Sequence, residues 1–282
     1  MPLASTKWLY ENISSVKIID STWHMPSENR NSFNEYQNEH IPNAVFFDID
    51  EYSDQESKLP HMLPSKKKWE AVMSSLGISN EDRIVIYDNS EVISSCRLWY
   101  TFIYFGHNPS SVKVLNGGLY KWKIEKLPLE NNKVQNKKTI YTSYINKDLV
   151  IDINSIKSNI KQMKFRLIDG RSQERFDGKI PEPREGLKSG SIPNSVCLPF
   201  KNVINKNKTF KKKDELMYIY KSVIDDFSED NIVFTCGSGI TSCVLALAYS
   251  LINNNYKPKI YDGSWAEYGK IIKWKNLLKS LL

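Results

Sequence analysis

Cys236 begins the segment Cys-Gly-Ser-Gly-Ile-Thr, which follows a short β-branched run and precedes a helical pattern. A loop between a strand and a helix points its backbone N–H groups and the helix N-terminus at any anion it holds. The glycines at 237 and 239 allow this loop to curl, so that several N–H groups can face the cysteine sulfur. The segment therefore predicts a nucleophilic thiolate at Cys236, with a pKa below the ~8.5 of a free cysteine.

Two other interpretations of Cys236 fit less well. A buried packing cysteine leaves the two glycines and two hydroxyl residues around it unexplained. A Cys-dependent phosphatase needs an arginine six positions after the cysteine to clamp the phosphoryl oxygens, and Ser242 stands at that position. The remaining target for this thiolate is a sulfur atom of the substrate, which is smaller than a phosphoryl group.

The two halves of the chain repeat each other. Four motifs of the first half recur in the same order and at nearly constant spacing in the second, which indicates a duplicated domain. Asp88 stands where the second half has Cys236, so we expect the first domain to be catalytically silent. The matching segments are 16–20 with 165–169, 40–45 with 191–196, 84–88 with 232–236, and Gly117 with Gly263.

Each half alternates short β-branched runs with helical patterns. This alternation predicts an α/β fold in which a mainly parallel sheet is flanked by helices. A chain of 282 residues suits two domains of ordinary size. We expect tandem domains at residues 1–128 and 148–282, joined by a polar linker at 129–147 that lacks any periodic pattern.

The composition excludes several classes of protein. No stretch approaches the ~18 apolar residues of a membrane helix, and residues 1–10 lack a signal-peptide pattern, so we expect a cytoplasmic protein. The four cysteines are too few and too irregularly spaced for a disulfide framework or a zinc site. The net charge of +7 comes from dispersed lysines without a compact basic and aromatic segment, so we expect anionic substrates rather than nucleic acid.

Together these residues resemble the rhodanese family, and most closely its two-domain 3-mercaptopyruvate sulfurtransferases. The active loop of those enzymes has the sequence Cys-Gly-Ser-Gly-Val/Ile-Thr, and the likeness extends along nearly the whole chain. It implies two tandem rhodanese-like domains, of which the second carries the nucleophile. The segments that carry it are 40–42, 46–50, 60–64, 76–78 and 85–88, and then 168–171, 175–176, 182–184, 189–193 and 261–265.

The resemblance implies a reaction and its participants. Cys236 takes the sulfur of 3-mercaptopyruvate as a persulfide, releases pyruvate, and passes the sulfur to cyanide or to a thiol acceptor such as thioredoxin. A polar relay of Ser238, His61 and Asp50 supplies the proton that the departing pyruvate needs, with the last two residues reaching over from the first domain. No metal and no organic cofactor are implied.

The resemblance also implies substrate contacts. Arg175 and Arg184 match the pair that holds the carboxylate and carbonyl of the substrate, a task that suits planar guanidinium groups. The rest of the loop, namely Gly237, Gly239, Ile240 and Thr241, is assigned to substrate binding as well. Thiosulfate-preferring relatives place Arg and Lys directly after the nucleophile, whereas Gly237 and Ser238 stand here, so we expect 3-mercaptopyruvate to be the better donor.

Two alternative functions remain open at this point. One is a thiosulfate sulfurtransferase, and the other is a non-catalytic rhodanese-like scaffold or sulfur carrier. The chain also departs from the family pattern, because Ser191 replaces a histidine. We expect Cys243 to pack within a helix rather than to form a disulfide with Cys236, and we assign Arg171 to structure.

Overall fold

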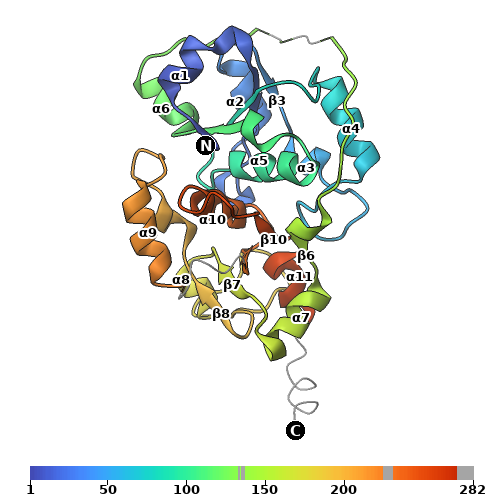
Figure 1. Cartoon of the computed structure of the whole chain (residues 1–282), viewed down its shortest axis with the longest axis vertical. Coiled ribbons are helices and arrows are strands. Elements are labelled where there is room, and N and C mark those ends of the chain that lie inside the picture. Colours follow the sequence, from blue (N-terminus) through green and yellow to red (C-terminus); the bar gives the residue numbers. More distant parts are fainter. Residues whose placement is uncertain (133, 135–136, 225–230, 272–282) are drawn as a thin grey trace.

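The computed structural model describes the chain except for residues 133, 135–136, 225–230 and 272–282. The described residues form two five-stranded sheets, with strand orders β1-β5-β4-β2-β3 and β6-β10-β9-β7-β8. Every strand pair in both sheets is parallel. The two orders are the same when each strand is matched with its counterpart, which confirms the predicted pair of α/β domains (Figure 1).

The first domain contains the first sheet and six α-helices. Its strands are β1 (Leu3–Ala4), β2 (Lys17–Asp20), β3 (Ala44–Phe46), β4 (Ile84–Tyr87) and β5 (Val112–Leu115). Its helices are α1 (Thr6–Glu11), α2 (Ser32–Asn38), α3 (Ile49–Tyr52), α4 (Lys66–Ser75), α5 (Ser95–Tyr104) and α6 (Gly118–Ile124), with 3-10 turns at Ile13–Ser15, Pro26–Glu28 and Pro109–Ser111.

The second domain repeats this plan around the second sheet. Its strands are β6 (Val150–Ile151), β7 (Arg166–Asp169), β8 (Ser195–Cys197), β9 (Ile232–Thr235) and β10 (Lys259–Tyr261). Its helices are α7 (Ile153–Gln162), α8 (Gln173–Phe176), α9 (Lys213–Lys221), α10 (Thr241–Ser250) and α11 (Ser264–Ile271), with 3-10 turns at Lys147–Leu149 and Phe200–Val203.

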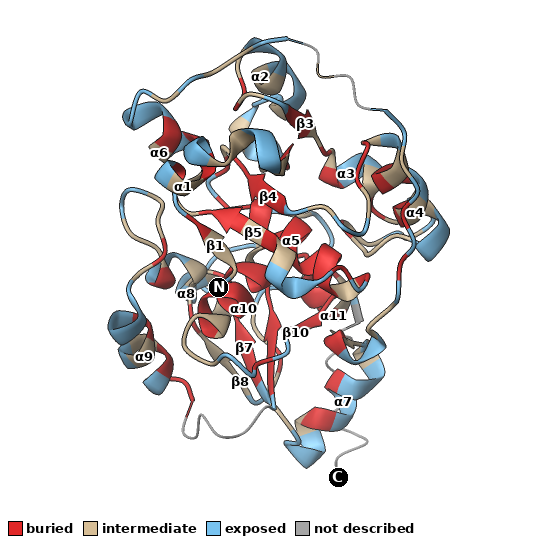
Figure 2. Cartoon of the chain, turned by 45° about the horizontal axis from the view of Figure 1, so that its top comes forward, coloured by how far each residue is buried: buried red, intermediate tan, exposed pale blue. Residues whose placement is uncertain are grey.

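The central strands β4 and β9 are apolar because both of their faces are covered. All four residues of each strand are buried, as expected for the middle of a parallel sheet with helices on both sides. Figure 2 shows this burial extending from β4 and β5 through α5 to α10, β7 and β10, while α4, α7 and α9 expose their outer surfaces.

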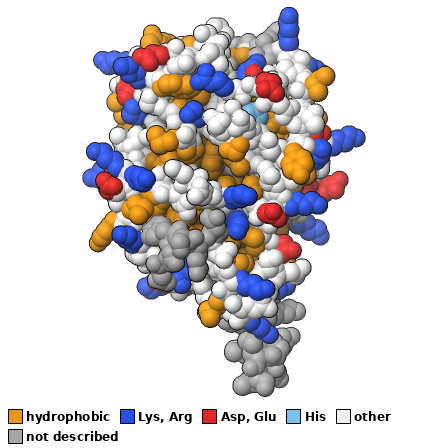
Figure 3. Space-filling model, in the orientation of Figure 1, with side chains coloured by type: hydrophobic (Ala, Val, Ile, Leu, Met, Phe, Trp, Pro, Cys, Tyr) orange, Lys and Arg blue, Asp and Glu red, His pale blue; other side chains and the backbone are white. Residues whose placement is uncertain are grey.

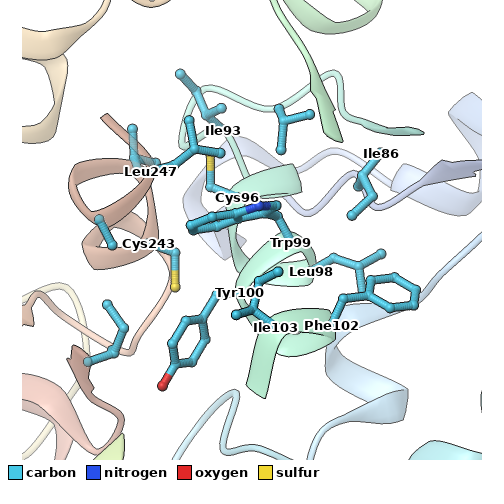
Figure 4. Packing of buried hydrophobic residues seen from close by; sticks show 14 of the residues in the cluster. Ile86, Ile93, Cys96, Leu98, Trp99, Tyr100, Phe102, Ile103, Cys243 and Leu247 are labelled. Atoms are coloured by element: carbon cyan, nitrogen blue, oxygen red, sulfur yellow. The ribbon is translucent and has the colours of Figure 1, made fainter. Parts of the chain in front are cut away.

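Helices α5 and α10 join the two domains. They pack against each other, and one cluster of buried apolar residues continues from the first domain into the second. Figure 4 shows Cys96 and Tyr100 of α5 in this cluster together with Cys243 and Leu247 of α10. Residues 242–249 of α10 are all buried, since the helix lies between its own sheet and α5. The interface is therefore as apolar as a domain core, and it fixes how the domains meet.

The connecting segment holds closely to the first domain. The N–H of Thr139 donates to Ser74 O at 3.1 Å, and the N–H of Ser143 donates to Glu70 Oε1 at 2.7 Å. Tyr141 is 3% exposed and packs against His107. The polar composition predicted a linker at 129–147. The second half of that segment packs along α4 and is hydrogen-bonded to it.

Three further features bear on the expected function. Figure 3 shows Lys and Arg side chains dispersed over one face of the molecule rather than gathered in one patch. Within the described ranges, no helix is both long enough and apolar enough to cross a membrane. The same residues contain no group of three or more His, Cys, Asp or Glu side chains placed to hold a metal ion.

Candidate active site

Cys236 lies in the loop between β9 and α10, at the carboxyl edge of the second sheet. This is the position where the loops of an open parallel sheet bind ligands. The loop is closed by backbone hydrogen bonds to the start of α11, from Trp265 N to Cys236 O at 2.9 Å and from Ala266 N to Gly237 O at 2.9 Å. The strand, the loop and two helices therefore hold the cysteine in one position.

Hydrogen-bond donors converge on the sulfur of Cys236. Burial alone would raise the pKa of this thiol, but the hydroxyls of Thr241 and Ser242 and the backbone N–H groups of Ser238 and Ser242 outweigh it and lower the pKa. The sulfur lies 3.6 Å from the Ser242 hydroxyl. The predicted curl of the loop around the sulfur is thus present, and Gly239 makes the turn with a φ of 80°.

Cys236 is only 2% exposed, so its side chain is buried. The guanidinium groups of Arg175 and Arg184 flank the same loop, with Arg175 Nη2 3.1 Å and Arg184 Nη1 3.9 Å from where a Cβ on Gly237 would lie. A side chain at position 237 would press against the Arg175 guanidinium.

Ser238, His61 and Asp50 form a continuous polar line across the domain boundary. His61 Nδ1 lies 3.0 Å from the Ser238 hydroxyl, and His61 Nε2 lies 3.0 Å from Asp50 Oδ1. A carboxylate only accepts hydrogen bonds, so Nε2 donates to Asp50, and in the neutral imidazole Nδ1 accepts from the Ser238 hydroxyl. The structure places the three predicted relay residues in contact and in the order that proton transfer needs.

The two first-domain members of the relay differ in exposure. The side chain of His61 is 3% exposed, whereas that of Asp50 is 65% exposed. Partial burial would raise the pKa of Asp50, but hydrogen bonds from His61 and from the Trp23 indole lower it. The carboxylate is therefore ionised at neutral pH. Trp23 could not be identified from the sequence, because an aromatic residue after a strand is an ordinary core residue.

Arg97 of α5 and Asp262 tie the domains together beside the relay. Arg97 Nη2 donates to His61 O at 2.5 Å, and Arg97 Nη1 lies 2.7 Å from Asp262 Oδ1 and donates to Gly239 O at 3.3 Å. Asp262 Oδ2 accepts from Leu63 N at 3.0 Å. His61 has a φ of 59°, so these bonds hold it in the left-handed region. The sequence signal for Arg97 was one charge in an otherwise apolar helix.

The two predicted substrate arginines differ in how free they are. Arg175 Nη2 pairs with Glu182 Oε2 at 2.5 Å, and the side chain of Glu182 is 1% exposed. Arg184 has no carboxylate partner among the described residues; its Nη2 donates to the Ser238 hydroxyl at 3.3 Å. Burial lowers the pKa of Arg184, and Arg175 adds to this effect. Among the described residues, Arg175 therefore has a carboxylate partner and Arg184 does not.

Arg171 has the structural role that we expected. Its guanidinium pairs with Asp169 at 2.7 Å and with Glu182 at 2.8 Å, and it lies 4.3 Å from the centroid of the Trp265 ring. It also donates to Gly190 O at 2.8 Å, which fixes the loop before Ser191.

Two other side chains of the second domain lie in the core. Ile240 belongs to the apolar cluster between the domains, and its assignment to substrate binding stays a prediction. Cys243 is fully buried and donates to Gly239 O at 3.1 Å, and burial raises the pKa of its thiol to about 12. Both side chains therefore contribute to packing.

The corresponding loop of the first domain holds a carboxylate in place of the sulfur. Asp88 Oδ1 accepts from Ser90 N at 2.8 Å and Asp88 Oδ2 accepts from Ser95 N at 3.0 Å. Ser95 is the first residue of α5, so this carboxylate occupies the position at a helix start that the Cys236 sulfur occupies at α10. Burial raises the pKa of the Asp88 carboxyl, while the hydrogen bonds from Ser95 and Ser90 act in the opposite direction.

Comparison with known proteins finds one family over both halves of the chain. The rhodanese-like domain model matches residues 5–125 and 152–270. The mitochondrial thiosulfate/3-mercaptopyruvate sulfurtransferase 1 of Arabidopsis thaliana is 37% identical over 291 residues, which cover 95% of this chain and 76% of that protein. The 3-mercaptopyruvate sulfurtransferase of Homo sapiens is 34% identical over 274 residues, or 94% of this chain and 91% of that protein.

A solved structure is similar over both domains. SseA from Escherichia coli, described among the 3-mercaptopyruvate sulfotransferases, superposes with a TM-score of 0.82 at 31% identity and covers 95% of this chain and 100% of that chain. The family model covers most of the chain, and both of its copies coincide with the two parallel sheets described above. The chain therefore belongs to the rhodanese family and consists of two tandem rhodanese-like domains.

Proposed function

We propose that this rhodanese-family sulfurtransferase moves the sulfur of 3-mercaptopyruvate onto Cys236 and then to an acceptor. The observation that carries the proposal is the meeting of two groups from different domains. The loop that lowers the pKa of Cys236 also carries Ser238, and Ser238 contacts His61 of the first domain at 3.0 Å. A nucleophile and a proton relay thus act on the same small space.

The reaction balances with the groups of this site. The Cys236 thiolate attacks the donor sulfur, an S–S bond forms, and the C–S bond breaks with its electron pair going to the methylene carbon. The proton of the donor thiol returns to this carbon through Ser238 and His61, and pyruvate leaves. The donor carbon gains the electrons that the donor sulfur gives up, so no external oxidant or reductant enters.

The second half-reaction regenerates the thiolate. A thiol acceptor such as thioredoxin, or cyanide, attacks the outer sulfur of the persulfide. The S–S bond breaks, and its electron pair returns to the sulfur of Cys236. The donors from Thr241, Ser242 and Ser238 that lower the pKa of Cys236 also make it a better leaving group in this step.

The charges around the loop favour 3-mercaptopyruvate over thiosulfate. Glu182 pairs with Arg175, which leaves Arg184 as the one cation beside the sulfur without a carboxylate partner in the described part of the chain. One guanidinium matches the single carboxylate of 3-mercaptopyruvate, whereas thiosulfate carries two charges. The relay is also needed for the pyruvate carbon and not for sulfite, which leaves as a stable anion.

Thiosulfate sulfurtransferase activity is the second candidate function. The Arabidopsis thaliana relative is named for both donors, and Arg184 would still attract a dianion. The ratio of kcat/KM for the two donors, with the same acceptor, tests the preference. A ratio in favour of thiosulfate would reverse our assignment of the donor.

The cytoplasmic location stays a prediction, and the Arabidopsis thaliana relative is named as mitochondrial.

Intact-mass spectrometry after exposure to 3-mercaptopyruvate tests the proposed function directly. We expect one added sulfur atom on the wild type and none on Cys236→Ser. Cys243→Ser is the matched control, because Cys243 lies in α10, directly after the loop of Cys236, but its thiol is buried in the core. This variant should therefore keep the adduct. A wild type without any adduct would point to a non-catalytic scaffold instead.

A further inference from the structure

Trp23 contacts both relay residues that the first domain supplies. Its indole Nε1 donates to Asp50 Oδ2 at 2.8 Å, and its ring meets the ring of His61 edge-on with the centroids 4.7 Å apart. Trp23 is 9% exposed, whereas the side chain of Asp50 is 65% exposed. A buried, rigid residue therefore holds an exposed carboxylate.

This contact determines the orientation of the Asp50 carboxylate. Asp50 Oδ1 accepts from His61 and Asp50 Oδ2 accepts from Trp23, so the carboxylate is held at both oxygens. An exposed aspartate bonded at one oxygen only would rotate and exchange that bond with water. The indole N–H limits this rotation and keeps Oδ1 directed at the imidazole.

Trp23 itself is held by the silent loop of the first domain. The Ser90 hydroxyl donates to Trp23 O at 2.5 Å, and Trp23 N donates to the Ser94 hydroxyl at 3.1 Å. Asp88 holds the loop in turn through the N–H groups of Ser90 and Ser95. Hydrogen bonds thus connect the position that matches Cys236 in the first domain to the relay that serves Cys236 in the second.

We propose that the silent loop of the first domain is the scaffold of the proton relay and that Trp23 is its positioning residue. The loop keeps the geometry of an anion-binding turn, in which the Asp88 carboxylate takes the place of a bound anion. Its hydrogen bonds to Trp23 position Trp23, and through Trp23 they position Asp50 and His61. The inference rests on the proposed function, because it concerns the proton that the pyruvate carbon requires.

Trp23→Phe tests the positioning role, with Trp99→Phe as the matched control. Both changes replace a buried indole with a smaller ring, and Trp99 is 4% exposed in the cluster of Figure 4 with no partner for its Nε1 among the described residues. With 3-mercaptopyruvate we expect kcat to fall about tenfold in Trp23→Phe, as for a lost hydrogen bond to a charged group, with KM within about twofold. Trp99→Phe should keep the wild-type kcat.

Thiosulfate serves as an internal control on the same protein sample. Sulfite leaves without a proton on carbon, so Trp23→Phe should turn over thiosulfate at the wild-type rate. Ser90→Ala removes the bond to Trp23 O and leaves the indole in place. We expect it to change kcat in the same direction and by less, again with 3-mercaptopyruvate alone.

The pH profile separates positioning from a purely structural role. The titratable or charged groups that face Asp50 within the described residues are His61 and, from the second domain, Arg184. Both remain in Trp23→Phe, and the lost indole N–H no longer stabilises the ionised carboxylate. The pKa of Asp50 then rises, so the acid limb of kcat for 3-mercaptopyruvate should move to higher pH. Trp99→Phe should leave this limb in place.

The outcomes distinguish the inference from the proposed function. An active wild type with an unaltered Trp23→Phe overturns the inference alone. Equal losses with both donors also overturn it, because they show that Trp23 only supports the fold. A wild type that forms no persulfide from 3-mercaptopyruvate overturns the proposed function and the inference with it.

Discussion

The imidazole of His61 and the hydroxyl of Ser238 lie 3.0 Å apart although 177 positions separate the two residues in the chain. They belong to different domains, so the relay exists only where the two domains pack together. The apolar contact of α5 with α10 and the polar bonds of Arg97 hold that arrangement. In the proposed mechanism, the first domain, which has Asp88 in place of the nucleophile, therefore supplies part of the machinery that serves Cys236.

His61→Gln should separate the two donors. Glutamine can accept a hydrogen bond from Ser238 but cannot carry a proton, so the enolate of pyruvate loses its proton donor. We expect kcat with 3-mercaptopyruvate to fall by about 10²-fold, the ordinary value of general acid–base catalysis, while kcat with thiosulfate changes far less. Steady-state kinetics with both donors and cyanide as acceptor check this. Equal losses would mean that His61 acts on the fold or on the thiolate.

The Thr241 hydroxyl should control the ionisation of Cys236. The folded-state pKa of this thiol is lowered, so its reactivity is present above that pKa and is lost as the pH falls through it. Thr241→Val removes a donor and should raise the midpoint of the alkylation rate by about one pH unit, the equivalent of a hydrogen bond of about 1.4 kcal/mol. The rate of iodoacetamide labelling, followed by mass in a Cys197→Ser background, measures the midpoint.

Thr241→Ser is the control for this series, because it keeps the hydroxyl and loses only a methyl group. Its midpoint should match that of the wild type. A Thr241→Val protein with an unchanged midpoint would show that the backbone N–H groups alone hold the thiolate. Burial raises the pKa of Cys197 to about 12, but this residue is partly exposed, so its removal keeps the signal specific.

The fold was predictable because local patterns and the global arrangement agree in this chain. The apolar runs at 84–87 and 232–235 became the central strands β4 and β9, and the duplicated motifs predicted two α/β domains of one kind, which the identical strand orders confirm. The position of Cys236 between a strand and a helix followed from the same patterns. The polar composition of 129–147 predicted a linker but could not indicate that Tyr141 and Ser143 pack on α4, because these contacts depend on the position of another element.

The rest of the site depends on contacts that have no local pattern. The motif at 182–184 contains Glu182 and Arg184, yet only the fold shows that Glu182 pairs with Arg175 and leaves Arg184 free. Arg97 and Trp23 likewise acquire their roles from residues in other elements, and the sequence alone offers no spacing that relates them. The sequence therefore indicated which residues belong to the site better than it indicated the contacts and role of each one.

Glu182→Gln should change both stability and donor preference. The buried Glu182 carboxylate pairs with both Arg171 and Arg175, of which Arg171 also has Asp169, and removing one partner of a buried ion pair costs about 3 kcal/mol or more. Arg175 would then act as a second cation beside Cys236, which favours the thiosulfate dianion. We expect a lower Tm and a higher ratio of kcat/KM for thiosulfate to that for 3-mercaptopyruvate. Glu185→Gln makes the same change of charge at an exposed neighbouring position, and it should leave both quantities nearly unchanged.

Gly239 should tolerate a side chain less well than Gly186, although both residues have a positive φ, of 80° and 77°. Alanine in this region costs about 1–2 kcal/mol in either place. At Gly239 the new Cβ would also lie 3.0 Å from Arg97 Nη1 and 3.2 Å from Asp262 O, whereas at Gly186 it meets nothing within 4 Å. Arg97 holds His61 O, so Gly239→Ala should lower the Tm further than Gly186→Ala and also reduce kcat with 3-mercaptopyruvate. Thermal unfolding and kinetics on the pair measure this, and equal effects of the two variants would show that Arg97 yields without disturbing the relay.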